Sequence, residues 1–158
     1  MCIRDRVKDK AKRFLACEKL SDLRRLGFDT NALQLKAINP PYYDFEVPKK
    51  KGGFRKIEAP QEDLKQIQKQ LNNYLQCVYF IQQSTASYGY IISVRDAIPQ
   101  KNILGNARKH HGARYLLNAD FKDFFHQIKS SRILHILQTA PFGFNKKTAH
   151  LLLSLIHI

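Results

Sequence analysis

The chain has 158 residues, enough for one domain with its own core, and its content of 44% hydrophobic and 25% charged residues is typical of globular proteins. No apolar run approaches the length needed to cross a bilayer, which excludes a membrane-spanning helix, so no membrane partner is expected. Lysine and arginine number 27 against 13 acids, and the net charge is +14. This excess indicates a polyanionic partner, most often nucleic acid, with a solvated basic surface as the alternative.

Both ends of the chain look foreign. MCIRDR (1–6) and LSLIHI (153–158) resemble translated sequencing-adapter ends found on assembled metagenomic reading frames. We therefore expect both ends to be non-native and the natural protein to be longer.

Residues 7–41 are expected to form an N-terminal helical extension, because apolar residues recur there at helical spacing and capping residues separate the runs. The predicted helices are 7–19, one that Ser21 and Asp22 cap and Gly27 ends, and one from Thr30 to Ala37 before Pro40 and Pro41.

A basic hairpin is expected next. Apolar and acidic residues alternate over 43–47, which predicts a strand. KKKGG (49–53) predicts a turn with two glycines, and FRKIEA (54–59) predicts the returning strand. Tyr42, Tyr43, Phe45 and Phe54 stand near the lysines and would suit base stacking.

A long helix is predicted after the hairpin. Pro60 is expected to open it, with Glu62 and Asp63 in the first turn, where the helix dipole favours acids. Its apolar stripe comprises Leu64, Ile67, Leu71, Leu75 and Val78.

The second half of the chain mixes strand and helix patterns. YGYIISV (88–94) is ambiguous but has strand character, and 96–100 looks like a loop. ARYLLNAD (113–120) is the best strand pattern in the chain, with Tyr115 to Leu117 expected to be buried. The predicted helices are 102–112, 124–137 with Phe124 in the core, and one from the cap Asn145 to Leu152. This order predicts an α+β fold rather than regular βαβ units.

Asp120 stands where the predicted strand ends, amid apolar residues. An acid in such surroundings costs free energy unless it is paired. One interpretation is a helix N-cap, in which the carboxylate accepts a backbone N–H bond. The other is a ligand for Mg²⁺, which prefers carboxylate oxygens and often bridges to substrate phosphates. Spacing alone gives the two equal weight.

Four segments follow one another in a recognisable order: FEVPKKKGGFRKIEAP (45–60), LKQIQKQL (64–71), NILGNARKHHG (102–112) and YLLNADFKDFFHQI (115–128). In this order they resemble bacterial reverse transcriptases of the retron and group II intron type, including relatives in antiviral defence. The resemblance covers roughly residues 40–152. It implies the fingers (42–112) and a partial palm with motif A (113–152) of a right-hand polymerase.

The resemblance also implies roles for single residues. Asp120 would be the catalytic aspartate that binds the first metal, Mg²⁺ or alternatively Mn²⁺, and the backbone carbonyl of Phe121 would face a metal too. Phe125 would be the steric gate that favours dNTPs over ribonucleotides. Arg55 and the lysines Lys49, Lys50 and Lys51 would hold the triphosphate of the incoming dNTP. The implied partners are an RNA template, an RNA–DNA hybrid and dNTP; the oligomeric state stays open.

Each of these residues has a plainer interpretation. The three lysines could form a solvated turn, Arg55 could pair across the hairpin with Glu46, and Phe125 could be part of the core. Asp123 is interpreted as a helix-start acid rather than a metal ligand.

The sequence departs from the family at its end. After Asp123 there is no acid, so the Tyr-x-Asp-Asp motif is missing, as is a thumb. One aspartate cannot hold the two metals of a phosphoryl-transfer site. We therefore expect an RNA-directed DNA polymerase whose present chain is inactive alone.

Other interpretations remain. The alternative to the polymerase is a non-catalytic basic RNA/DNA-binding domain, and a weaker one is a helix-turn-helix within 7–38. The three cysteines show no C-x-x-C spacing and no pairing pattern, which predicts a reducing, cytoplasmic location. The six histidines form no zinc signature, and the polar, charged start of the sequence shows no secretory signal.

Overall fold

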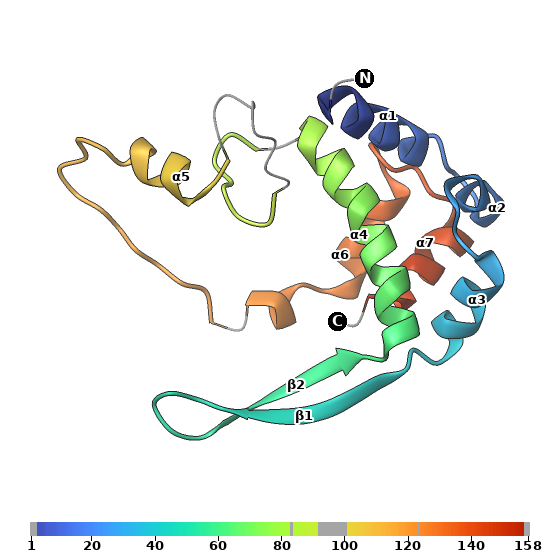
Figure 1. The fold of residues 1–158 in the computed structure, drawn as a ribbon, viewed down its shortest axis with the longest axis horizontal. Coiled ribbons are helices and arrows are strands. Elements are labelled where there is room, and N and C mark those ends of the chain that lie inside the picture. The colour runs from blue at the N-terminus through green and yellow to red at the C-terminus, as the bar shows by residue number, and fades with distance from the viewer. Residues whose placement is uncertain (1–2, 83, 92–100, 123, 157–158) are drawn as a thin grey trace.

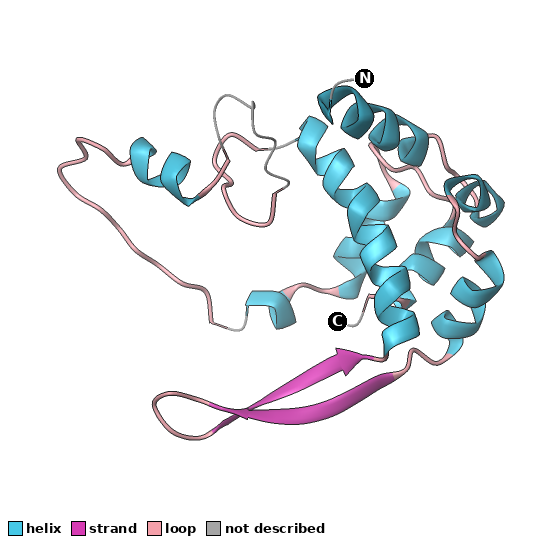
Figure 2. Cartoon of the chain, viewed as in Figure 1, coloured by secondary structure: helices cyan, strands magenta, loops and turns pink. Residues whose placement is uncertain are grey.

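The computed structural model describes residues 3–82, 84–91, 101–122 and 124–156. Helices gather around the long helix α4 (Glu62–Gln82), a two-stranded hairpin projects from them, and α5 (Ile103–Lys109) stands apart on long connections (Figures 1 and 2). Within the described residues, no helix is both long and apolar enough to cross a lipid bilayer. The fold is thus a helical core with one small sheet, which agrees with the predicted mixture of helix and strand.

The N-terminal helices form as predicted, with shifted ends. They are α1 (Ile3–Leu15), α2 (Leu20–Leu23), the 3₁₀ turn η1 (Arg24–Leu26) and α3 (Thr30–Ile38). Gly27 ends η1 with a φ of 83°, a left-handed conformation that glycine adopts without strain.

The caps of α2 and α3 differ from the prediction. Asp29, not Thr30, caps α3: its Oδ1 accepts the N–H groups of Asn31 (2.9 Å) and Ala32 (3.1 Å). Thr30 is the first helical residue, and its hydroxyl accepts a bond of 2.9 Å from Arg24. Asp22 lies within the first turn of α2 and reaches back to the preceding backbone. Both Asp and Thr are good caps, so the sequence alone did not separate the two neighbours.

The hairpin is confirmed. Strands β1 (Tyr42–Pro48) and β2 (Phe54–Pro60) pair antiparallel, and β2 extends through Pro60, so α4 begins at Glu62. In the turn, the N–H of Lys49 donates to the carbonyl of Gly53 (2.9 Å). Gly52 and Gly53 have φ values of 90° and 80°, which explains the two glycines after the lysines.

The core forms where α1 crosses α4. The predicted stripe of α4 faces inward, with Leu64, Leu71 and Val78 buried. Phe14 of α1 is fully buried and stacks on Tyr74 of α4 at 5.4 Å between ring centres. The core is completed by residues of α6 (Ser130–Gln138), α7 (Lys146–Ser154) and the turns beside them, such as Leu137, Phe144, Ala149, Leu152 and Leu155.

One glutamine joins the base of the hairpin to the end of α7. Gln68 on α4 donates from Nε2 to the hydroxyl of Tyr42 (2.6 Å) and to the carbonyl of Leu155 (2.7 Å). Tyr42 is the first residue of β1, so the hairpin starts from a fixed position on the helical core.

The strand predicted at 113–120 is wrong. These residues are neither strand nor helix, and all are exposed, including Tyr115 (86%), Leu116 (69%) and Leu117 (89%). A strand needs a neighbouring strand to hydrogen-bond with, and in the described part of the chain β1 and β2 pair only with each other.

The other predictions for the second half of the chain have mixed outcomes. Residues 88–91 are irregular, whereas 92–94 and the predicted loop 96–100 lie outside the described residues, as do Asp123 and Cys2. The helix expected over 124–137 is split into the 3₁₀ turn η2 (Phe124–Gln127) and α6, and Phe124 is exposed rather than buried in the core. Asn145 caps α7 as predicted, accepting the N–H of Thr148 at 2.9 Å.

Candidate functional site

The basic residues singled out in the hairpin gather at its tip. Lys49, Lys50 and Lys51 form the turn, and Arg55 is the second residue of β2; all four side chains are exposed. In the described part of the chain, none of the four side chains makes a hydrogen bond or an ion pair. Figure 1 shows this tip extending away from the helical core, so the charges are open to a ligand.

The two faces of the hairpin differ in chemistry. Residues directly opposite in an antiparallel pair share a face, and alternate residues change face. Arg55 lies opposite Val47, on the same face as Phe45 and Tyr43, whose rings stack at 5.9 Å. That face therefore combines one cation with exposed aromatic surface.

The opposite face is acidic. Lys56 is paired in register with Glu46 and forms ion pairs with Asp44 (2.8 Å) and Glu58 (3.6 Å). The hydrogen bond with Asp44 raises the pKa of Lys56. The interpretation of Arg55 as the cross-strand partner of Glu46 is therefore wrong, because Lys56 occupies that position.

Asp120 and Phe121 lie in the exposed segment 113–122. Asp120 makes no hydrogen bond or ion pair within the described residues, and Phe121 is 77% exposed. Nor do the described residues contain any group of three His, Cys, Asp or Glu side chains placed to hold a metal. Within the described residues, the carboxylate of Asp120 therefore does not accept the backbone N–H bond that the N-cap interpretation requires. The metal interpretation stays a prediction.

Phe125 lies in an exposed aromatic cluster. Phe124 contacts Phe125 edge-to-face at 5.3 Å and Phe121 at 6.1 Å between ring centres. Phe125 is 64% exposed, so its interpretation as a core residue is wrong for this structure. The ring is available to contact a ligand.

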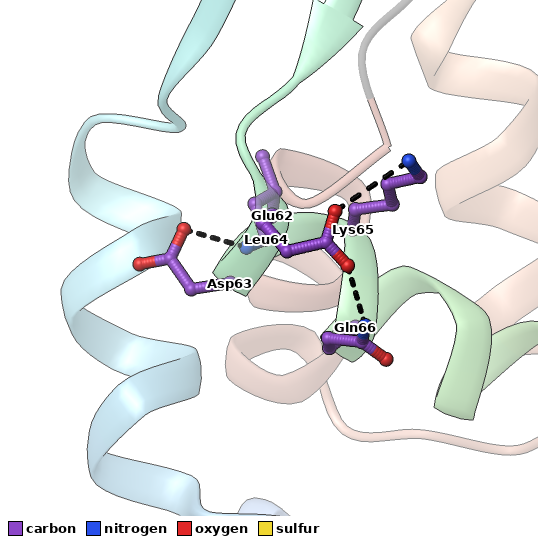
Figure 3. A network of polar contacts seen from close by, with 5 residues as sticks. All are labelled: Glu62, Asp63, Leu64, Lys65 and Gln66. Atoms are coloured by element: carbon purple, nitrogen blue, oxygen red, sulfur yellow. Dashed lines mark hydrogen bonds and ion pairs between the residues drawn. The ribbon is translucent and has the colours of Figure 1, made fainter.

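The two acids at the start of α4 bind neighbouring side chains and backbone of α4 and α3. Figure 3 shows Glu62 accepting a hydrogen bond from Gln66 (2.5 Å) and pairing with Lys65 (3.5 Å), while Asp63 accepts the N–H of Leu64 (2.9 Å). Asp63 also pairs with Lys36 of α3, which lowers the pKa of its carboxyl. The hydrogen bond with Gln66 lowers the pKa of Glu62. The predicted place of both acids in the first turn is confirmed.

Sequence reasoning missed Lys101. Its ammonium donates to the carbonyl oxygens of Ser84 (2.7 Å), Thr85 (2.9 Å) and Ser87 (3.0 Å). It also lies 4.4 Å from the centre of the Tyr88 ring. Backbone carbonyls carry no sequence signal, since every residue has one.

The comparisons with known proteins agree with the resemblance to reverse transcriptases. Residues 47–156 match the family described as reverse transcriptase (RNA-dependent DNA polymerase). The chain is 30% identical over 125 residues to the retron Mx65 reverse transcriptase of Myxococcus xanthus, covering 75% of this chain and 27% of that protein. It is 31% identical over 87 residues to the retron Ec83 reverse transcriptase of Escherichia coli, covering 55% and 25%.

A further relative is the retron Mx162 reverse transcriptase of Myxococcus xanthus, 29% identical over 111 residues, which covers 70% of this chain and 21% of that protein. The chain thus spans about a quarter of the length of these curated relatives. The matched residues include the hairpin tip beyond Val47, Asp120 and Phe125. On this match, the chain belongs to the reverse transcriptase family.

Proposed function

We propose that this chain is part of an RNA-directed DNA polymerase of the retron type, which adds dNTPs to a primer on an RNA template. The observation that carries the proposal is the family match over 47–156, which takes in the basic tip and the Asp120 segment. The names of the relatives support the retron type over a group II intron or defence enzyme. A cytoplasmic location is part of the proposal and rests on the cysteine pattern alone.

The hairpin tip is proposed to bind the triphosphate of the incoming dNTP. Phosphoryl transfer depends mainly on positioning and on neutralising the charge of the phosphates. A guanidinium suits this task because its planar fork binds phosphate oxygens in pairs. Arg55 is exposed, and its side chain has no ion pair within the described residues, so its donors are available.

Asp120 and the carbonyl of Phe121 are proposed as metal ligands. Carboxylate and carbonyl oxygens suit Mg²⁺, which takes about six oxygen ligands and keeps several waters. Among the described residues Asp120 belongs to no group of three side chains that could hold a metal, so these residues fit part of a site and not a complete one. We accordingly propose that the chain alone does not catalyse polymerisation and derive no step through the metal.

The test is Asp120→Asn in the longer polymerase. Asparagine keeps the size of the side chain but loses the negative charge that Mg²⁺ requires. We expect primer extension on an RNA template to fall to background while RNA affinity stays unchanged. Asp9→Asn on α1, an equal loss of charge at an exposed site, is the control. Retained extension in Asp120→Asn would contradict the metal role.

A non-catalytic RNA/DNA-binding domain is the second candidate, favoured by the exposed Tyr43–Phe45 stack beside the tip. Stacking platforms and lysines suffice for binding single strands without catalysis. The same experiment separates the two functions, because a binding domain would show no extension in the wild type of the longer protein.

A further inference from the structure

We propose that a second basic surface, the α5 arm, binds the phosphodiester backbone of a single nucleic-acid strand. We define the α5 arm as Arg108, Lys109, His110, His111 and Arg114. The inference rests on the proposed function, because it assumes a nucleic-acid partner, and it adds a contact surface separate from the hairpin tip.

The charge of the arm is the first argument. Between residues 101 and 119 the sequence contains no aspartate or glutamate, so nothing within the segment neutralises its cations. All five arm residues are exposed. Figure 1 shows α5 standing away from the helical core, which leaves the arm accessible.

The plainer explanation is that cations favour the C-terminal end of a helix. This accounts for Arg108 and Lys109, which lie in the last turn of α5. It does not account for Arg114, which lies beyond the end of the helix and is separated from it by a turn at Gly112. Helix stability alone therefore explains part of the cluster.

The helix that carries the arm does not contribute to the core that the structure describes. None of its residues is buried, and Ile103 (88%) and Leu104 (54%) are largely exposed. A helix of this length is marginal in water unless something stabilises it. Its capping residue Asn102 accepts the N–H of Gly105 at 2.8 Å, which stabilises the first turn.

The start of the helix that carries the arm is nevertheless held in place. Lys101, next to the cap, binds the loop at Ser84 to Ser87 through its ammonium group. That loop is tied to α4 by Gln76, whose Nε2 donates to the carbonyl of Tyr90 at 2.7 Å. A positioned surface loses less conformational entropy on binding than a free one.

The chemistry of the arm fits a single strand. Arginine and lysine neutralise successive phosphates, and aromatic rings stack on unpaired bases. Tyr115 follows Arg114 directly and is 86% exposed, so a ring and a cation stand side by side in the chain. The shared ligand is a phosphodiester backbone, which RNA and single-stranded DNA both supply.

The experiment measures the salt dependence of binding by the 158-residue chain. Fluorescein-labelled 20-nucleotide RNA and DNA of the same sequence are titrated at several NaCl concentrations, with fluorescence anisotropy as the signal. Four variants are compared with the wild type. The arm variant is Arg108→Ala/Lys109→Ala/Arg114→Ala, the control is Lys8→Ala/Lys10→Ala/Lys12→Ala on α1, and the charge-conserving variant is Arg108→Lys/Lys109→Arg/Arg114→Lys. The fourth is the tip variant, Lys49→Ala/Lys50→Ala/Lys51→Ala/Arg55→Ala.

We expect the arm variant to reduce the slope of log affinity against log salt by about 2, since each neutralised phosphate of a single strand contributes roughly 0.7. The α1 control and the charge-conserving variant should keep the wild-type slope. An equal reduction of the slope with RNA and with DNA would indicate contacts to the phosphodiester backbone. A reduction with RNA alone would indicate contacts to the 2′-hydroxyl and would overturn the proposal of a shared backbone ligand.

Two outcomes overturn the inference in distinguishable ways. In the first, the arm variant keeps the wild-type slope while Lys49→Ala/Lys50→Ala/Lys51→Ala/Arg55→Ala reduces it. This result would show that the arm does not bind the strand, and it would leave the proposed function unaffected. A wild-type chain that binds neither RNA nor DNA overturns the inference, while the proposed function is judged separately by primer extension with the longer polymerase. Circular dichroism of each variant checks that the fold is intact, and because the substituted residues are exposed the core is not disturbed.

Discussion

Arg55 lies directly across the hairpin from Val47, while the next residue, Lys56, lies across from Glu46. Successive residues of a strand point to opposite faces, so these two neighbouring cations serve different surfaces. Arg55 belongs to the face of the Tyr43–Phe45 stack, and Lys56 is held by Asp44 on the other face.

This arrangement predicts unequal effects of two adjacent alanine substitutions in the longer polymerase. Arg55→Ala should raise KM for dNTP about 10- to 100-fold, because a hydrogen bond to a charged group contributes roughly 1.5–3 kcal/mol. Lys56→Ala is the matched control and should leave KM near the wild-type value. Steady-state primer extension at varied dNTP checks both, and equal effects of the two variants would remove the assignment of Arg55.

The exposure of Phe125 predicts a change in sugar selectivity with little loss of stability. Phe125→Ala should admit ribonucleotides in the longer polymerase, because the proposed gate acts through the bulk of the ring. A buried phenylalanine would cost about 3–5 kcal/mol on truncation, but this ring is 64% exposed, and we expect at most about 1 kcal/mol from its pairing with Phe124.

Two measurements check the Phe125 prediction: the ratio of dNTP to rNTP incorporation, and the urea midpoint of the variant. Phe124→Ala is the control, since it removes the neighbouring ring. Unchanged selectivity in Phe125→Ala would reject the gate.

Thr148 predicts a stabilising substitution. Its side chain is buried, and its hydroxyl oxygen has no hydrogen-bond partner within the described residues. Thr148→Val keeps the shape and removes an unsatisfied polar group, so the free energy of unfolding should rise by roughly 1–2 kcal/mol. Thr30→Val is the contrast, because the Thr30 hydroxyl accepts a bond from Arg24, and that variant should be less stable. Urea unfolding of the 158-residue chain measures both.

Asp22 predicts a dependence of stability on pH. Backbone N–H groups of Lys19 and Glu18 bind its carboxylate and lower its pKa below the ordinary value of 3.8, the Lys19 bond being the larger cause. A lowered pKa in the folded state means that the stabilisation is present above the ordinary pKa and is lost as pH falls through the lowered one.

The wild type should therefore be more stable than Asp22→Ala at pH 7, and the difference should shrink below about pH 4. Urea unfolding from pH 7 to pH 2.5 measures this difference. Ser21→Ala, an exposed neighbour without an ionisable group, is the control. A difference that grows on acidification would contradict the role of the Asp22 carboxylate.

Removing the ammonium group of Lys101 should loosen the loop at 84–91 and leave the rest of the fold unchanged. Lys101→Met keeps the length of the side chain but removes the donors to Ser84, Thr85 and Ser87. Amide hydrogen exchange within 84–91 should become faster, while exchange in α4 stays slow. Lys109→Met, at an exposed site, should change neither. Unchanged exchange within 84–91 would show that the loop does not depend on Lys101.

The sequence predicted those parts of the fold whose signals are local. The stripe of α4 repeats at helical spacing, and the hairpin combines alternation with a glycine turn, so both were located correctly. The segment 113–120 has an equally clear strand pattern, but becoming a strand depends on a partner elsewhere in space, which no local pattern specifies.

The candidate site was predictable in composition but not in geometry. The positions of Lys49 to Lys51 and Arg55 at the hairpin tip follow from the turn and the register. The exposure of Phe125 depends on which other segments pack against it, and no local pattern specifies that. The bonds of Lys101 join it to carbonyls 14 to 17 residues earlier in the chain, which carry no side-chain signal.

The exposed run from Tyr115 to Leu117 has a consequence for handling the chain. Its backbone forms no backbone hydrogen bond within the described residues, and its side chains are apolar. Such a segment offers free N–H and C=O groups to an extended segment of another molecule. We therefore expect concentrated solutions of the chain to self-associate through intermolecular β-pairing at this run, and a lysine in place of Leu116 to raise the concentration at which light scattering begins.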